Sequence, residues 1–183
     1  MILASKSPRR REILTKAGFK FRIYPSPVAE KTEETEPGAV VRSLALQKAA
    51  AVADLFPDEP VLGSDTVVYC KREILGKPKD AADAFRLLSL QNNSWQEVYT
   101  GVALVWRSRN IAWTESDVSR CKARELGEEE LKALSVKHLD KAGAYAVQDN
   151  DDRFIEKIDG RFDTIVGLSM NLVYKFMRKA GLK

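Results

Sequence analysis

The hydrophobic residues of this chain follow two spacings, one typical of strands and one typical of helices. Short apolar runs and apolar–polar alternation mark the strands, and turn residues such as glycine, proline and asparagine bound them. The stretches expected as strands are 1–4, 19–24, 61–69, 73–75, 99–106, 111–122, 143–147 and 154–158.

Apolar residues three and four positions apart mark the helices, which begin at proline or capping residues and end near glycine. The helices expected on this basis cover residues 8–17, 37–56, 80–89, 128–138 and 169–180. Strands and helices alternate early, and hairpins dominate the middle of the chain. We therefore expect an α/β fold with a mixed, twisted sheet flanked by helices.

Length and charge set broad limits on what the chain can be. Its 183 residues suit a single domain over 1–183, and the net charge of +4 suits a phosphate-bearing partner. That charge falls short of a nucleic-acid footprint, and by itself it fits an ordinary protein surface equally well. No long apolar run is present, and Glu12 interrupts the basic start, so we expect no membrane partner and a cytoplasmic location.

The cysteine and histidine content excludes two kinds of site. Cys70 and Cys121 are far apart and lack a nearby ligand pattern, which predicts reduced, structural thiols. His138 is the one histidine, so a histidine-based zinc site and a serine triad both lack their parts.

The first turn of the first expected helix carries hydroxyls, free backbone N–H groups and arginines. Ser5, Ser7, Arg9 and Arg10 surround Pro8, which suits the first helical position because an amide there has no helical partner. Such a helix start predicts an anion site. Taken alone, the same residues also describe an ordinary helix start with a solvated basic turn, and that interpretation is the commoner one.

Three charged residues stand out because their surroundings are not typical of a protein surface. Lys48 lies on the apolar side of its expected helix, Asp65 interrupts a buried strand, and Lys77 is pinned between Gly76 and Pro78. Each has a structural alternative: a lysine that reaches solvent, a carboxylate that caps a local bend, and a common turn lysine.

Taken together, the unusual residues form a chemically coherent set. Several cations and hydroxyls with two carboxylates suit a polyphosphate and a hard divalent metal, Mg²⁺ or Mn²⁺. The members are Ser5, Arg9, Arg10, Lys48 and Lys77 on one side and Glu30 and Asp65 on the other. The glycine-rich signatures of Rossmann and Walker-type nucleotide sites are absent from the sequence.

Ordered blocks along the whole chain resemble the Maf family of nucleotide pyrophosphatases. The blocks are Leu3-Ala4-Ser5-Lys6-Ser7-Pro8-Arg9-Arg10, Leu62-Gly63-Ser64-Asp65-Thr66-Val67-Val68, Gly76-Lys77-Pro78, Thr100-Gly101-Val102, Asp140-Lys141-Ala142-Gly143-Ala144-Tyr145-Ala146-Val147-Gln148 and Val166-Gly167-Leu168. The resemblance implies a fold related to the inosine-triphosphate pyrophosphatases, with two lobes around a cleft. It also implies metal-dependent hydrolysis of a nucleoside triphosphate to the monophosphate and pyrophosphate.

The same resemblance implies roles for individual residues. The aspartate that matches Asp65 is the proton acceptor, and the residues that match Glu30, Lys48 and Lys77 line the same site. We expect Glu30 and Asp65, together with phosphate oxygens, to hold the metal ion. The branch acting on dTTP and UTP, a house-cleaning activity, carries an Arg, a Thr and a Gln, which match Arg9, Thr66 and Gln148. An amide both donates and accepts, so Gln148 can pair with the O4 and N3–H edge of uracil or thymine.

The sequence departs from the resemblance in two places. Asp149, Asn150, Asp151 and Asp152 stand where many members have a Gly-x-Gly-Ala type turn, which puts acids near the expected base pocket. Ser169 replaces a proline, an exchange of one helix-start residue for another.

Other functions remain open at this stage. A 7-methyl-GTP or other modified-nucleotide pyrophosphatase would use a similar site, and modified pyrimidine nucleotides fit the same expectation. A non-catalytic protein that binds nucleotides or nucleic acid in cell division would use the same basic residues. Trp95, Trp106 and Trp113 would then be its stacking surfaces, although packing in the core or in a hairpin is the commoner role of such residues. A homodimer is implied by the resemblance alone.

Overall fold

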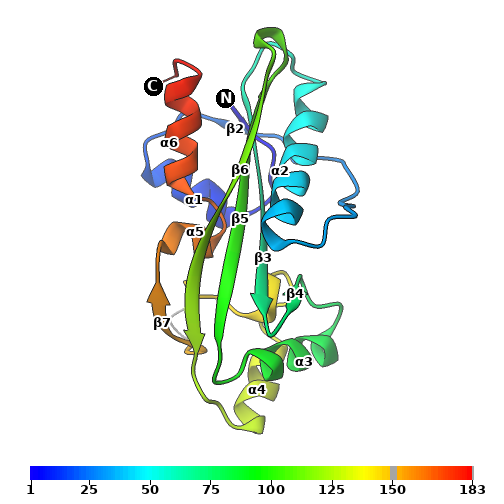
Figure 1. The fold of residues 1–183 in the computed structure, drawn as a ribbon, viewed down its shortest axis with the longest axis vertical. Coiled ribbons are helices and arrows are strands. Elements are labelled where there is room, and N and C mark those ends of the chain that lie inside the picture. Colours follow the sequence, from blue (N-terminus) through cyan, green and yellow to red (C-terminus); the bar gives the residue numbers. More distant parts are fainter. Residues whose placement is uncertain (149–151, 183) are drawn as a thin grey trace. The chain divides into compact units, whose positions relative to one another are not determined.

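The computed structural model describes residues 1–148 and 152–182 of the chain, and Figure 1 shows their path. The strands are β1 (Ile2–Leu3), β2 (Arg22–Ile23), β3 (Val61–Cys70), β4 (Glu73–Leu75), β5 (Trp95–Trp106), β6 (Ile111–Ala123) and β7 (Ile155–Asp159). The helices are α1 (Pro8–Lys16), α2 (Pro37–Ala53), α3 (Ala81–Gln91), α4 (Glu128–Ser135), α5 (Phe162–Val166) and α6 (Met170–Lys179), with 3₁₀ turns η1 (Arg107–Arg109) and η2 (Ala142–Ala144).

The strands form one mixed sheet in the order β2-β1-β3-β5-β6-β7, with β4 added to β3. Strand β1 is parallel to β2 and β3, whereas β4 runs antiparallel to β3 and β7 runs antiparallel to β6. The mixed sheet flanked by helices confirms the expected α/β class. Within the described ranges, no helix is long and apolar enough to cross a membrane.

The chain divides into two compact units. The first contains Met1–Thr66, Thr100–Asp117 and the chain from Val166 onward, and the second contains Val67–Tyr99 and Val118–Ile165. Strands β3, β5 and β6 each contribute residues to both units. The expectations of one domain over 1–183 and of a cleft between two lobes stay predictions.

The first unit buries residues on both faces of β1, because successive side chains of a strand point to opposite sides. Leu3 packs with Leu14 of α1 and with Phe176 of α6, whereas Ile2 packs on the other face with Ala45 of α2. Helix α2 therefore covers one face of the sheet in this unit, and α1 and α6 contribute to the core on the other.

Two glycines allow α2 to lie directly against the sheet. A Cβ atom at Gly63 would come within 2.3 Å of the Ala45 carbonyl oxygen, and one at Gly101 within 2.2 Å of the Val41 carbonyl oxygen. Only glycine fits at these two strand positions. This close approach brings the inner side of α2 next to the Gly-Ser-Asp-Thr segment of β3.

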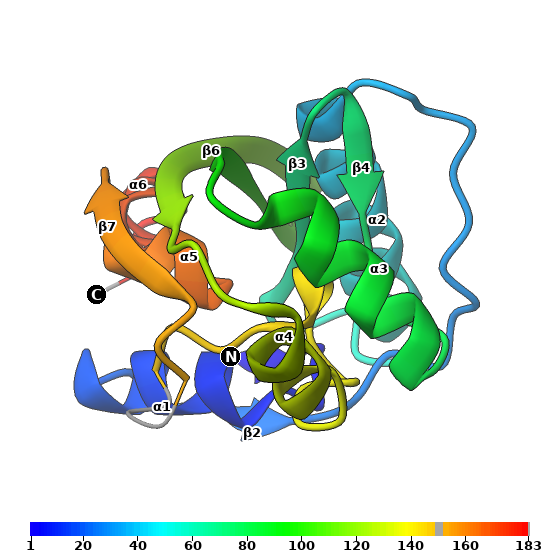
Figure 2. The ribbon, with the colours of Figure 1, turned by 90° about the horizontal axis from the view of Figure 1, so that it is seen from below.

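The second unit has its own core, in which α3 and α4 lie side by side (Figure 2). Phe154 is fully buried there beside Tyr145, with 5.7 Å between their ring centroids. Cys70 and Cys121 are both free and buried, as expected for structural thiols.

The expected strand over 143–147 is wrong, because the chain there forms the 3₁₀ turn η2. Gly143 and Ala144 have φ values of 73° and 64°, which a strand cannot contain. The N–H of Gly143 donates to the Gly76 carbonyl at 3.0 Å, and the Gln91 side chain donates to the Gly143 carbonyl at 2.8 Å. Contacts with residues that are distant in the sequence therefore determine the conformation of this segment.

Several boundaries also differ from the expectations. Helix α2 ends at Ala53 and α4 at Ser135, so His138 lies beyond its helix, and α5 had no counterpart among the expected helices. Strand β2 contains only Arg22 and Ile23, and Ile23 is exposed rather than half-buried.

Candidate active site

A buried lysine between two carboxylates forms the centre of the candidate site. Nζ of Lys48, on α2, lies 2.6 Å from Oδ1 of Asp65 on β3 and 3.0 Å from Oε2 of Glu30 in the loop before α2. The side chains of Lys48 and Asp65 are each 10% exposed, and that of Glu30 is 47% exposed. Three residues expected in one site are thus brought together.

This geometry excludes the structural alternatives for Lys48 and Asp65. Strand β3 runs without a break from Val61 to Cys70, so Asp65 does not cap a bend, and Lys48 does not reach solvent. Removing two charges from water is costly, and an apolar pair of similar size would often stabilise the fold as well or better. The pair is therefore better explained by chemistry than by stability.

The side chain of Arg10 connects three parts of the first unit: the segment before α1, strand β3 and the chain just after α5. Its Nε donates to the Gly167 carbonyl at 2.8 Å, Nη1 donates to Oγ of Ser5 at 3.2 Å, and Nη2 donates to Oγ1 of Thr66 at 3.3 Å. Burial lowers the pKa of the Arg10 guanidinium below its ordinary value, and the carboxylate of Asp65 opposes that shift.

These contacts limit what Arg10 can offer to a ligand. A guanidinium carries five N–H groups, and three of them are used inside the protein. Arg10 therefore fixes the positions of Ser5 and Thr66 and has at most two further N–H groups to offer a phosphate. The sequence placed Arg10 in the site but gave no sign of this connecting role.

Ser64 and Thr100 also belong to this network, although neither is among the residues to which the sequence assigned a role in the site. Oγ of the fully buried Ser64 lies 2.8 Å from the Gly101 carbonyl oxygen and 3.0 Å from the Gly167 carbonyl oxygen. Its single proton serves one of these acceptors at a time. Oγ1 of Thr100 lies 2.9 Å from Oγ1 of Thr66. The available signal was that both Ser64 and Thr100 belong to the ordered blocks.

The start of α1 forms as the sequence predicted. Pro8 occupies the first helical position, and Oγ of Ser7 accepts the N–H of Arg10 at 3.5 Å. Arg9 lies on this first turn, partly exposed. Its charge lowers the pKa of Arg10 further, which places the two guanidinium groups in one positive field.

Lys77 and Gln148 belong to the second unit, and the structure describes them there. Lys77 is exposed and directly follows Gly76, whose carbonyl accepts the N–H of Gly143. Gln148 is exposed at the end of the described segment that follows η2. Of the acidic turn, Asp149, Asn150 and Asp151 lie outside the described residues, so their expected effect on base preference stays a prediction.

The carboxylates of the site fit a metal ion only in part. Across 1–148 and 152–182 no group of three or more His, Cys, Asp or Glu residues could hold a metal. Mg²⁺, however, is commonly bound by one or two carboxylates together with substrate phosphates and water. Glu30 and Asp65 match that chemistry, since both carboxylates already face one cation, the Lys48 ammonium.

The fold and the site together define an α/β protein with the charges of a phosphate-handling enzyme. The sequence model of the Maf-like protein family matches residues 1–180, so the chain belongs to the Maf family. A solved structure, that of the Staphylococcus aureus Ham1 protein, has the same fold, with a TM-score of 0.55 over 98% of each chain at 13% identity.

Curated relatives match over almost the whole chain. A protein of Elusimicrobium minutum named dTTP/UTP pyrophosphatase is 51% identical over 99% of this chain and 98% of its own. Proteins with the same name from Koribacter versatilis and Bacillus cereus are 38% and 40% identical, covering 100% and 98% of this chain and 95% and 94% of their own.

Proposed function

We propose that this protein hydrolyses dTTP and UTP to the nucleoside monophosphate and pyrophosphate, a house-cleaning activity that extends to modified pyrimidine nucleotides. The observation that carries the proposal is the buried Lys48–Asp65 pair next to the basic start of α1. The name shared by relatives up to 51% identical supports the same reaction.

Asp65 acts as the general base in this reaction. It takes a proton from a water molecule whose oxygen attacks the α-phosphorus, the bond from that phosphorus to the bridging oxygen breaks, and pyrophosphate leaves. Lys48 holds Oδ1 of Asp65 at 2.6 Å and so fixes the direction of the carboxylate. A base positioned in this way contributes about 10²- to 10⁴-fold in rate.

The cationic residues stabilise the negative charge that moves onto pyrophosphate. Ser5, Arg9 and Arg10 lie at or before the N-terminal turn of α1, where backbone N–H groups and the helix dipole also favour an anion. Lys77 is the further cation that we propose for this role. Charge stabilisation of this kind is the main catalytic contribution of a protein to phosphoryl transfer.

Glu30 and Asp65 would hold the divalent cation, Mg²⁺ or Mn²⁺, together with phosphate oxygens. When bound, such an ion neutralises phosphate charge that the protein's cations leave uncompensated. Base recognition falls to Gln148, with Arg9 and Thr66 as the other residues of the dTTP and UTP pattern.

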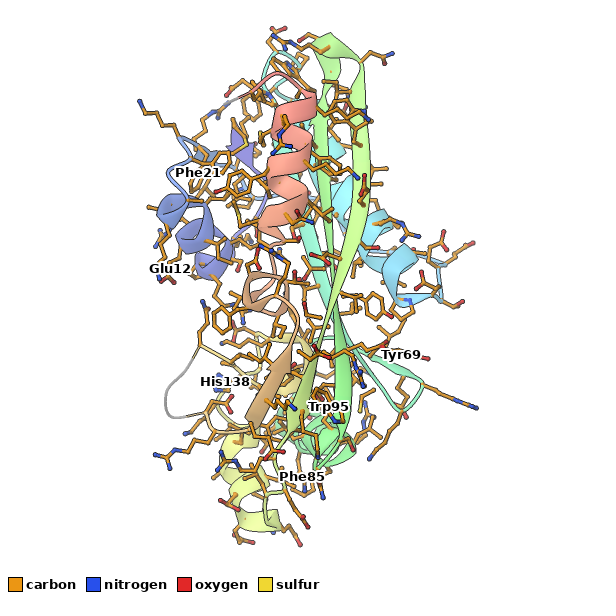
Figure 3. The ribbon with its side chains drawn as sticks, turned by 60° about the vertical axis from the view of Figure 1, so that its left-hand side comes forward. Glu12, Phe21, Tyr69, Phe85, Trp95 and His138 are labelled. Carbon is orange, nitrogen blue, oxygen red and sulfur yellow. The ribbon has the colours of Figure 1, made fainter. Side chains whose placement is uncertain are left out.

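The three tryptophans do not favour the alternative of a nucleic-acid-binding protein. Trp106 is buried beneath the guanidinium of Arg109, 3.8 Å from its ring centroid, and Trp113 packs against Phe176. Trp95, visible in Figure 3, is partly exposed, and Arg120 lies over its ring. Each ring thus already has a packing partner.

The decisive experiment measures pyrophosphate release from a panel of nucleotides with Mg²⁺, with Mn²⁺ and with EDTA. We expect dTTP and UTP to be hydrolysed fastest and EDTA to abolish turnover. Faster hydrolysis of 7-methyl-GTP would show that a modified purine nucleotide is the substrate, and binding without pyrophosphate release would indicate a non-catalytic protein.

The homodimer and the cytoplasmic location stay predictions. Sedimentation of the purified protein tests whether it forms a dimer.

A further inference from the structure

Asp152 is a buried carboxylate in the second unit that the proposed chemistry does not use. Its side chain is 1% exposed. Oδ2 accepts the N–H of Ala146 at 2.5 Å, and Oδ1 accepts the N–H of Phe154 at 2.9 Å. Nε2 of His138 lies 3.2 Å from Oδ2.

These contacts make Asp152 a link between two stretches of backbone on either side of Gln148. Ala146 precedes Gln148 by two positions, and Phe154 is anchored in the core with no exposed surface. The carboxylate therefore fixes the backbone just before Gln148 to a rigid part of the second unit. His138, labelled in Figure 3, is itself buried, and its Nε2 lies 3.2 Å from Oδ2 of the same carboxylate.

A fixed backbone matters for a glutamine that reads a base. The amide of glutamine can pair with the O4 and N3–H edge of uracil, but after a flip of the amide it can also pair with the N4–H₂ and N3 edge of cytosine. Selection between the two bases therefore depends on how firmly the amide is held, and not only on its presence.

We propose that Asp152 is a positioning residue for Gln148 and sets the preference of the enzyme for uracil over cytosine without touching the nucleotide. This inference rests on the proposed function. Asp152, the last acid of the 149–152 stretch, then acts by holding the backbone and not by contact with the base.

The isosteric variant Asp152→Asn tests the proposal, because it keeps the shape of the side chain and replaces one acceptor oxygen with an NH₂ group. One of the two backbone N–H groups then loses its acceptor. We expect the ratio of kcat/KM for UTP to that for CTP to fall about tenfold, through a higher KM for UTP with kcat within about twofold. Glu156→Gln, an exposed acid on β7 with the same change of charge, should leave the ratio unchanged.

A double-mutant cycle with Gln148→Ala shows whether Asp152 acts through Gln148. In the Gln148→Ala background, Asp152→Asn should change the UTP to CTP ratio less than about twofold. A similar fall in both backgrounds, or an unchanged ratio in the single variant, would overturn the proposal. His138→Gln keeps both backbone hydrogen bonds but changes the group that lies 3.2 Å from Oδ2 of Asp152. It therefore serves where Asp152→Asn does not fold, and by loosening the carboxylate it should lower the ratio about twofold.

Failure of the proposed function gives a different result. A wild-type protein that releases no pyrophosphate from any nucleotide contradicts the proposed function. In that case calorimetric titration of UTP and CTP into wild-type and Asp152→Asn protein tests the positioning role by the ratio of the two affinities, which should fall in the variant. Active wild-type protein with an unchanged ratio in Asp152→Asn contradicts the positioning role alone.

Discussion

Lys48 and Asp65 face each other across the contact between α2 and β3, with 2.6 Å between Nζ and Oδ1. Their positions depend on two glycines, because Gly63 and Gly101 let the backbone of α2 approach the sheet. A feature of packing thus determines the geometry of the proposed catalytic pair.

Asp65→Asn should abolish most turnover while the protein stays folded. The variant keeps the shape of the side chain but removes the base, so kcat on dTTP and UTP should fall about 10²- to 10⁴-fold. Pyrophosphate release and circular dichroism measure the two effects. Asp58→Asn, an exposed aspartate near the end of α2, is the matched control and should retain full activity. Near-native turnover in Asp65→Asn would refute the role of Asp65.

Lys48→Met should reduce both activity and stability, because it leaves the buried carboxylate of Asp65 without its cation. We expect a loss of about 3 kcal/mol in the free energy of unfolding, since breaking a buried pair leaves an uncompensated charge. The double variant Lys48→Met, Asp65→Leu should recover most of that stability and none of the activity. Recovery of turnover in the double variant, measured beside urea unfolding, would show that the pair is structural.

Much of the first unit could be predicted from the sequence because its signals are local. Pro8 and Gly18 mark α1 by their own backbone preferences, and the apolar run of β3 indicates a buried strand whatever it pairs with. Lys48 and Asp65 were visible as candidates because each stands where its chemistry does not match its surroundings. Their mutual contact was not visible, since no local signal pairs an α2 residue with a β3 residue.

The features that sequence analysis missed depend on contacts between distant residues. Arg10 bonds to Thr66 and Gly167, whose proximity exists only in the folded chain. The 143–147 segment has the composition of a strand, but the bonds of Gly143 to Gly76 and Gln91 keep it in a turn. Tertiary contacts of this kind override local propensity.

Gly101→Ala should destabilise the protein strongly, because its Cβ would come within 2.2 Å of the Val41 carbonyl oxygen. Either β5 or α2 must shift, at a cost of about 3 kcal/mol or more in the free energy of unfolding. Gly76→Ala is the matched control, since a Cβ there meets no atom within 4 Å, and it should cost less than about 1 kcal/mol. Equal urea midpoints for the two variants would contradict the close approach of α2.

Glu30→Gln should raise the Mg²⁺ concentration needed for half-maximal activity, because one of the two expected carboxylate ligands is lost. A shift of about tenfold fits the loss of one charged ligand, with kcat at saturating Mg²⁺ falling much less. Glu30 is half exposed, so the free energy of unfolding should hardly change. Glu33→Gln, an acid in the same loop, is the control. An unchanged Mg²⁺ dependence would remove Glu30 from the metal site.

Tyr145 should make the protein less stable at alkaline pH. Burial raises the pKa of the Tyr145 hydroxyl well above its ordinary value, and the neighbouring Cys121 thiol, 3.4 Å away, adds to the shift. The unfolded chain therefore loses this proton at a lower pH than the folded protein. The stabilising contribution is complete below about pH 10 and is lost as the pH rises through the raised pKa of the folded state.

Urea unfolding of wild type and Tyr145→Phe at about pH 8 and about pH 10.5 tests this linkage. The wild type should lose more stability between the two pH values than the variant, which lacks the titrating hydroxyl. Tyr174→Phe makes the same chemical change at an exposed position of α6 and should leave the wild-type difference unchanged. If Tyr145→Phe and wild type lose equal stability, the Tyr145 hydroxyl is not the group responsible, and the buried thiols, whose pKa values burial also raises, become the alternative.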